Sequence, residues 1–112
     1  MTSVRELVKA TQKELHEPNL LPNRAAVMLN QTTALIGNVN DELRAAEMQY
    51  KHVLLTCLRA NDKANRARIE AETSPEYARW QEARHVKELT VEMVRSLKAF
   101  LRIAEEEMRL TR

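Results

Sequence analysis

The chain has 112 residues, which is room for one domain with a single core. It contains one glycine and three prolines, and it is rich in residues that favour helices. The 18 basic and 16 acidic residues nearly balance, so no strong overall charge indicates a polyanionic partner. No apolar run approaches the roughly 20 residues of a membrane helix, and no basic-then-apolar leader opens the chain. We therefore expect a cytoplasmic protein with no membrane partner.

The first predicted element is a short helix over about residues 3–16. Ser3 opens it with a capping box of the Ser-x-x-Glu type. Pro18 ends the helix, because its ring disfavours helical geometry in the preceding residue. We expect this helix to lie near Met28 and Leu35 of the second helix.

The second predicted helix, over about residues 23–60, carries the most regular pattern in the chain. Apolar and small residues recur at alternating intervals of four and three, which is typical of a helix that packs lengthwise against another helix. This seam consists of Ala25, Leu29, Thr32, Ile36, Val39, Leu43, Ala46, Tyr50, Val53 and Cys57. Gly37 costs about 1 kcal/mol relative to alanine inside a helix, so we expect another backbone to approach it closely.

Residues 61–74 are predicted as a linker. Asn61, Asp62 and Asn65 compete with helical hydrogen bonding, whereas alanines at intervals of three and four continue the seam. The second helix could therefore extend to about Glu72, or a loop could be followed by a short helix. We favour the loop.

The third predicted helix covers about residues 75–110. Ser74 is its expected N-cap, Pro75 suits the first helical position, and Glu76 suits the first turn. Its apolar stripe consists of Ala83, Val86, Thr90, Met93, Val94, Leu97, Phe100, Leu101, Ala104 and Met108. The predicted fold is all-α: a short N-terminal helix plus a long antiparallel two-helix hairpin, a coiled-coil-like three-helix arrangement in one domain of residues 1–112.

The sequence indicates no enzyme, no cofactor and no small-molecule substrate. A single glycine excludes a Gly-rich phosphate loop, and no nucleophile has a recognisable base. Glu82-x-x-His85 resembles one motif of a di-iron bundle, but His85 falls toward solvent, so we expect no metal site. Cys57 lies on the seam, and its neighbours Thr56 and Leu58 supply no positive charge. We interpret it as a small apolar filler in a reducing compartment.

Met48, His52 and Leu55 recur at i, i+4 and i+7 on the outer side of the second helix, away from the seam. Such residues are either scattered surface apolars or a second contact face for self-association or a partner helix. Both interpretations stay open, and self-association through this stripe is the sharper hypothesis. The expected partners are a second copy of the chain, another protein, or both.

Positive charge concentrates between residues 59 and 102, where ten basic residues meet seven acidic ones. Tyr77 and Trp80 lie nearby, so this region could bind a single-stranded nucleic acid, DNA or RNA, through phosphate contacts and base stacking. The candidate residues are Arg59, Lys63, Arg66, Arg79 and Arg84. Glutamates lie between these basic residues and reduce the local positive charge, so we favour an ordinary charged surface in contact with solvent. Trp80 lies near the core stripe, so we favour its interpretation as a core anchor.

The half of the chain from Tyr50 onward, with Ser-Pro-Glu-Tyr at 74–77 and Val-Glu-Met-Val-Arg-Ser-Leu-Lys at 91–98, resembles small α-helical hairpin proteins encoded by tailed phages. Some of these resemble accessory proteins encoded beside recombination or replication genes. The resemblance implies a phage accessory protein in the host cytoplasm and implies no functional residue. We therefore expect a non-enzymatic helical interaction or assembly protein that binds another protein. The alternative is a nucleic-acid-binding accessory protein of phage recombination or replication.

Overall fold

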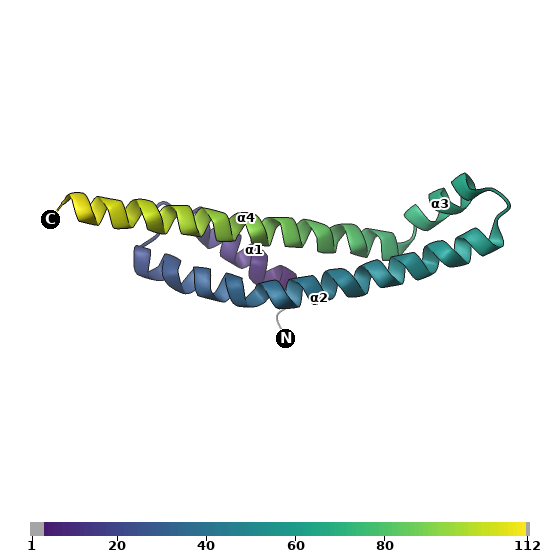
Figure 1. Ribbon diagram of the computed structural model, residues 1–112, viewed down its shortest axis with the longest axis horizontal. Helices are drawn as coiled ribbons and strands as arrows, with labels where there is room; N and C mark the ends of the chain where they lie inside the picture. Colours follow the sequence, from purple (N-terminus) through teal and green to yellow (C-terminus); the bar gives the residue numbers. More distant parts are fainter. Residues whose placement is uncertain (1–3, 112) are drawn as a thin grey trace. The chain divides into compact units, whose positions relative to one another are not determined.

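The structure is a computed structural model that describes residues 4–111. These residues form four helices and no strand: α1 (Val4–Leu15), α2 (Pro22–Ala60), α3 (Ala64–Glu72) and α4 (Pro75–Leu110) (Figure 1). The prediction of an all-α fold is therefore confirmed. The predicted capping box at Ser3 lies outside the described residues. Within the described part of the chain, no helix combines the length and apolar character needed to cross a bilayer.

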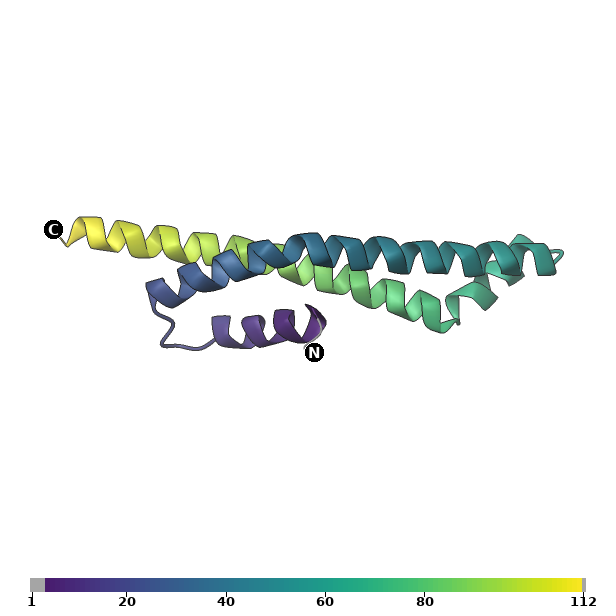
Figure 2. The same ribbon diagram turned by 90° about the horizontal axis from the view of Figure 1, so that it is seen from below.

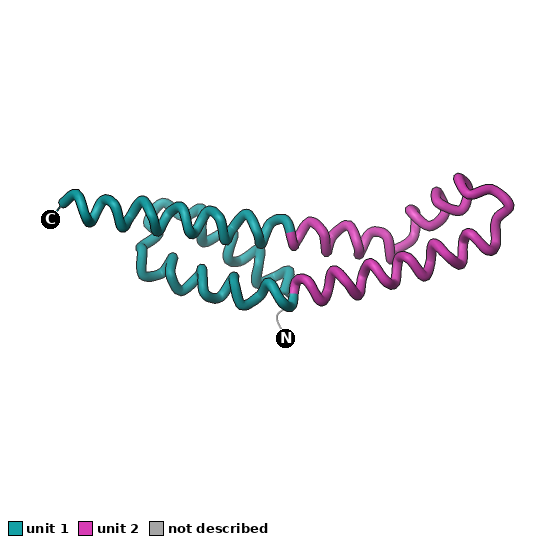
Figure 3. The backbone as a smooth tube through the Cα atoms, in the orientation of Figure 1, with its two compact units in different colours: residues 1–38, 88–112 teal, residues 39–87 magenta. Residues whose placement is uncertain are grey.

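The chain divides into two compact units (Figure 3). Unit 1 comprises Met1–Asn38 and Glu88–Arg112, and unit 2 comprises Val39–Lys87. Unit 1 therefore joins two segments that are distant in sequence, whereas unit 2 is one continuous stretch of chain, and α2 and α4 each contribute to both units.

In unit 1, α1 and α2 lie beside α4 (Figure 2). Ala25 and Met28 of α2 form a buried cluster with Leu97 of α4, and Leu15 of α1 packs against it. The expected position of the first helix near Met28 is thereby confirmed. Leu35 is half-buried, and its expected contact with the first helix stays a prediction.

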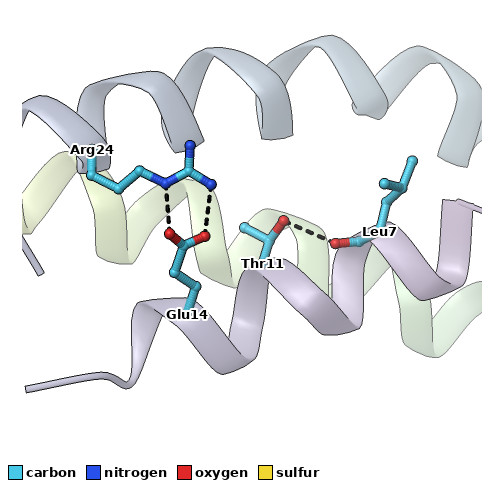
Figure 4. Close-up of polar contacts among 4 residues, drawn as sticks. All are labelled: Leu7, Thr11, Glu14 and Arg24. Atoms are coloured by element: carbon cyan, nitrogen blue, oxygen red, sulfur yellow. Dashed lines mark hydrogen bonds and ion pairs between the residues drawn. The ribbon is translucent and has the colours of Figure 1, made fainter.

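An ion pair links α1 to α2 within unit 1 (Figure 4). The Arg24 guanidinium donates two hydrogen bonds to the Glu14 carboxylate, Nε to Oε1 at 2.5 Å and Nη2 to Oε2 at 2.8 Å. In this arrangement both carboxylate oxygens are engaged at once, which fixes orientation more strongly than a single contact. The pair therefore holds the end of α1 against the start of α2.

Unit 2 has its own core, built from α2, α3 and α4. Tyr50 and Cys57 of α2 cluster with Ala67 and Ala71 of α3, and Trp80 of α4 packs against them. Both alanines are fully buried. Their small side chains let α3 approach α2 closely.

The predicted linker over 61–74 contains α3. Only residues 61–63 and 73–74 interrupt the helices there. The Asn61 side chain donates to the Cys57 carbonyl and to Glu70 Oε2, each at 2.9 Å, which ends α2 and ties it to α3. The segment therefore has the loop followed by a short helix.

The start of α4 has the predicted cap. The Tyr77 backbone N–H donates to Ser74 Oγ at 3.2 Å, and Ser74 Oγ donates to the Ala71 carbonyl at 2.5 Å. Ser74 thus joins the end of α3 to the beginning of α4. Pro75 is the first helical residue, where its missing N–H costs nothing.

The predicted seam of α2 is confirmed, since all ten of its members are buried or half-buried. The stripe of α4 is likewise covered, except that Met108 is 59% exposed near the helix end. The expected close approach at Gly37 is wrong. A Cβ placed there would meet nothing within 4 Å, and the residue is exposed.

Candidate protein-interaction face of α2

Met48, His52 and Leu55 lie on one exposed face of α2 in unit 2. At about 100° per residue they fall within about 60° of one another and opposite Tyr50 and Cys57. Met48 is 68% exposed and Leu55 is 43% exposed, and His52 is also exposed. The structure therefore brings the three predicted residues together on the side of α2 that faces away from the core.

The same spacing extends this face beyond the three predicted residues. Ala45 and Asp41 continue it toward the start of the helix, and Arg59 continues it toward the end, and all three are exposed. We call this surface the outer face of α2; it consists of Asp41, Ala45, Met48, His52, Leu55 and Arg59. The sequence already contains this extended spacing, but charged ends do not stand out in a search for apolar stripes.

A shallow depression borders the outer face. It is lined by Met48, Gln49, His52, Val53 and Glu76. Gln49 Oε1 accepts a hydrogen bond from the Arg79 guanidinium, which links α2 to α4 at this edge. Sequence reasoning did not find Gln49 or Glu76, because their roles depend on which turn of α4 packs against α2.

A salt bridge lies along the other edge of the outer face. Lys51 Nζ lies 3.1 Å from Glu47 Oε1, one helical turn earlier. Both groups are solvent-accessible, so the pair adds little stability, but it places a carboxylate beside this ammonium group. The outer face therefore carries Met48 and Leu55 beside His52, with charged residues at its two ends and along this edge.

Three aromatic side chains pack together behind the outer face. Tyr50 stacks on Trp80 with ring centroids 4.9 Å apart, and Tyr77 lies 5.1 Å from Tyr50. The Arg84 guanidinium lies 5.2 Å from the centre of the Trp80 ring, a cation–π distance. The pKa of Tyr50 is raised, mainly by burial of its hydroxyl group and to a lesser extent by the negative charge of Glu72. Trp80 thus anchors α4 on α2, which confirms its interpretation as a core anchor.

The five basic candidate residues are all exposed, but they form two groups. Arg59, Lys63 and Arg66 surround the connection from α2 to α3, where Lys63 and Arg66 help line a second depression beside the exposed Ile69. Arg79 binds Gln49, which is about 15 Å along α2 from Arg59 at 1.5 Å per residue. The structure therefore does not gather the basic residues into one patch.

The other candidate groups are Cys57 and the pair Glu82 and His85. Cys57 is buried. The pKa of its thiol is raised, mainly by this burial and to a lesser extent by the negative charge of Glu70. Glu82 is half-buried while His85 is exposed. Among residues 4–111, no group of three or more His, Cys, Asp or Glu side chains could hold a metal ion.

Comparisons with protein-family models, with curated proteins and with solved structures find no match to this chain. The resemblance to phage hairpin proteins stays a prediction from the sequence. The function is therefore inferred from the surface of the chain.

Proposed function

We propose that the protein is a non-enzymatic helical interaction protein that binds another protein through the outer face of α2. The observation that carries this proposal is the exposure of Met48 and Leu55 on one side of a helix whose opposite side, at Tyr50 and Cys57, packs against the core of unit 2. Burial of exposed apolar area contributes about 25 cal/mol per Å². A partner helix laid along the face would gain this energy with little rearrangement, as in other helix-recognition modes.

The proposed setting is that of a phage accessory protein in the host cytoplasm. The lone thiol of Cys57 fits a reducing compartment, where a single cysteine needs no partner. The resemblance to phage hairpin proteins supplies the phage origin, which genome context of the coding sequence would test directly.

The proposed framework for this surface is the antiparallel hairpin of α2 and α4. In unit 1, Met28 shares a cluster with Leu97, and in unit 2, Gln49 accepts a hydrogen bond from Arg79. The later residue of α2 thus contacts the earlier residue of α4, which is the order of contacts in an antiparallel pair of helices. In such a hairpin Ala78, the neighbour of Arg79, lies beside the part of α2 near Gln49, about 20 residues along α2 from Asn30. Spin labels at Asn30→Cys and Ala78→Cys, in a Cys57→Ala background, should therefore give one separation of about 30 Å at 1.5 Å rise per residue. A distribution without a peak there would contradict the hairpin.

The interaction proposal is tested by comparing proteins retained by immobilised wild type and by a Met48→Glu/Leu55→Glu variant. A carboxylate at each position removes apolar area and adds charge that a partner would have to desolvate. The matched control is Ile103→Glu/Met108→Glu, which places the same charges at residues that are 61% and 59% exposed on α4. We expect one defined protein, or the chain itself, to bind wild type and control but not the variant. Identical binding by all three proteins would refute the proposal.

The rival function is nucleic-acid binding by the basic residues around the α2–α3 connection. The observation in its favour is the exposure of Arg59, Lys63 and Arg66 near one turn. Fluorescence anisotropy with labelled single- and double-stranded DNA and with RNA, at two salt concentrations, tests it. Micromolar binding that collapses with salt would favour the rival, and absence of binding at low salt would remove it.

A further inference from the structure

We propose that the partner of the outer face of α2 is the same face of a second copy of this chain, docked antiparallel with Met48 opposite His52. This inference rests on the proposed function, because it names the occupant of the same surface. It follows from the order of the six residues along the face.

The six residues of the outer face recur at intervals of four and three, the pattern that lets two helices interlock over several layers. In an antiparallel pair of identical helices, a step forward along one helix is a step back along the other. The numbers of any two residues that face each other therefore add up to the same total. If Met48 faces His52 of the second copy, Ala45 faces Leu55 and Asp41 faces Arg59. All six residues are therefore used, and a two-fold axis repeats every contact.

Each of these layers is complementary. Asp41 and Arg59 carry opposite charges at the two ends of the face, and charge pairs of this kind set partner choice and register. The small Ala45 leaves room for the larger Leu55, as interdigitating layers require. At the centre, the flexible Met48 thioether meets the edge or face of the His52 ring, a favourable contact for sulfur.

Other alignments of the same face are worse. A parallel pair places Asp41 against Asp41 and Arg59 against Arg59, so like charges meet at both ends. An antiparallel pair shifted by one heptad in one direction places Arg59 against Met48. Shifted in the other direction, it places Asp41 against His52 and leaves Leu55 and Arg59 without partners. The charges at the ends therefore select one orientation and one register.

One contact in this arrangement is unfavourable. Lys51 flanks the centre of the face, so the two Lys51 ammonium groups approach each other across the two-fold axis. The salt bridge to Glu47, with Nζ and Oε1 3.1 Å apart, keeps a carboxylate beside each ammonium and reduces the repulsion. The face from Asp41 to Arg59 is only about 27 Å long at 1.5 Å per residue. We therefore expect a dimer that dissociates on dilution.

Charge reversal tests the orientation and the register together. Asp41→Arg places positive charge at both ends of the face, and Arg59→Asp places negative charge at both ends. At low salt, sedimentation equilibrium should show self-association of each single variant weakened by about tenfold, since two attractive pairs become repulsive. The double variant should regain wild-type association, and a 1:1 mixture of the two single variants should associate as a heterodimer.

Glu88→Arg and Lys98→Asp are the matched controls, because they make the same charge changes at exposed positions of α4. They should self-associate as wild type does. Far-UV circular dichroism confirms that every variant is folded. Weakened single variants that are not rescued by the double variant or by mixing would overturn the antiparallel register.

Failure of this inference is distinct from failure of the proposed function. A wild type that is monomeric at every concentration, yet loses a protein partner on Met48→Glu/Leu55→Glu, would overturn the second copy as occupant and leave the interaction function intact. A monomeric wild type whose retained proteins are unchanged by that substitution would overturn both.

Discussion

At the scale of single residues, Cys57 shows how position determines reactivity. Its thiol packs among Ala67, Ala71 and Tyr50, and burial raises its pKa, as does the negative charge of Glu70. We expect the native thiol to react with an aromatic disulfide reagent at neutral pH at least about tenfold more slowly than in denaturant, because both access and thiolate fraction are reduced. Exposed Ser96, changed to cysteine in a Cys57→Ala background, is the fast-reacting control. Equal rates for native and denatured Cys57 would contradict its burial.

The Glu14–Arg24 pair predicts a dependence of stability on pH. Hydrogen bonding from Arg24 lowers the pKa of Glu14 below its usual value of 4.5. A carboxyl group with a lower pKa in the folded than in the unfolded state stabilises the fold above its unfolded pKa, and this stability is lost as pH falls through the folded pKa. Glu14→Gln should therefore lower the melting temperature more at pH 7 than at about pH 2.5, where part of this stabilisation is lost. Thermal melts at both pH values test this, with Glu17→Gln as control. An equal loss at both pH values would contradict the ion-pair account.

At the scale of helices, Gly37 lowers the stability of α2 relative to alanine and permits no close contact in return. A Cβ at this position would meet nothing within 4 Å. Gly37→Ala should therefore stabilise the protein by about 1 kcal/mol, the helix-propensity difference between the two residues. Urea unfolding measures this change, and Ala34→Gly, one turn earlier at an exposed position, should destabilise by a similar amount. A loss of stability in Gly37→Ala would show that another element occupies the space.

The helices differ in how far local sequence determined them. The seam of α2 and the Ser74 cap of α4 were predictable, because periodicity and capping act within a few residues. The segment that holds α3 was ambiguous, because its turn-forming residues favour a loop, whereas Ala67 and Ala71 favour a helix only once α2 covers them. The prediction for Gly37 was wrong because the close contact that its small size suggested is not formed. Tertiary packing decides both cases.

At the scale of the whole molecule, the candidate face was predictable in part. Met48, His52 and Leu55 follow from helical phase alone, and their exposure agrees with it. The adjoining depression was not predictable, because Glu76 reaches it only through the packing of α4 on α2. The division into two units was not predictable either, since unit 1 joins two segments that are far apart in sequence, and the boundaries fall inside α2 and α4.

The central claim is that the outer face of α2 is a protein-binding surface whose partner is a second copy. Light scattering on wild type and on Met48→Glu/Leu55→Glu, over a range of concentrations, tests it most directly. The account predicts a wild-type mass that approaches twice the 13.0 kDa of one chain as concentration rises, while the variant stays at the mass of one chain. The same mass for both proteins at every concentration would contradict it.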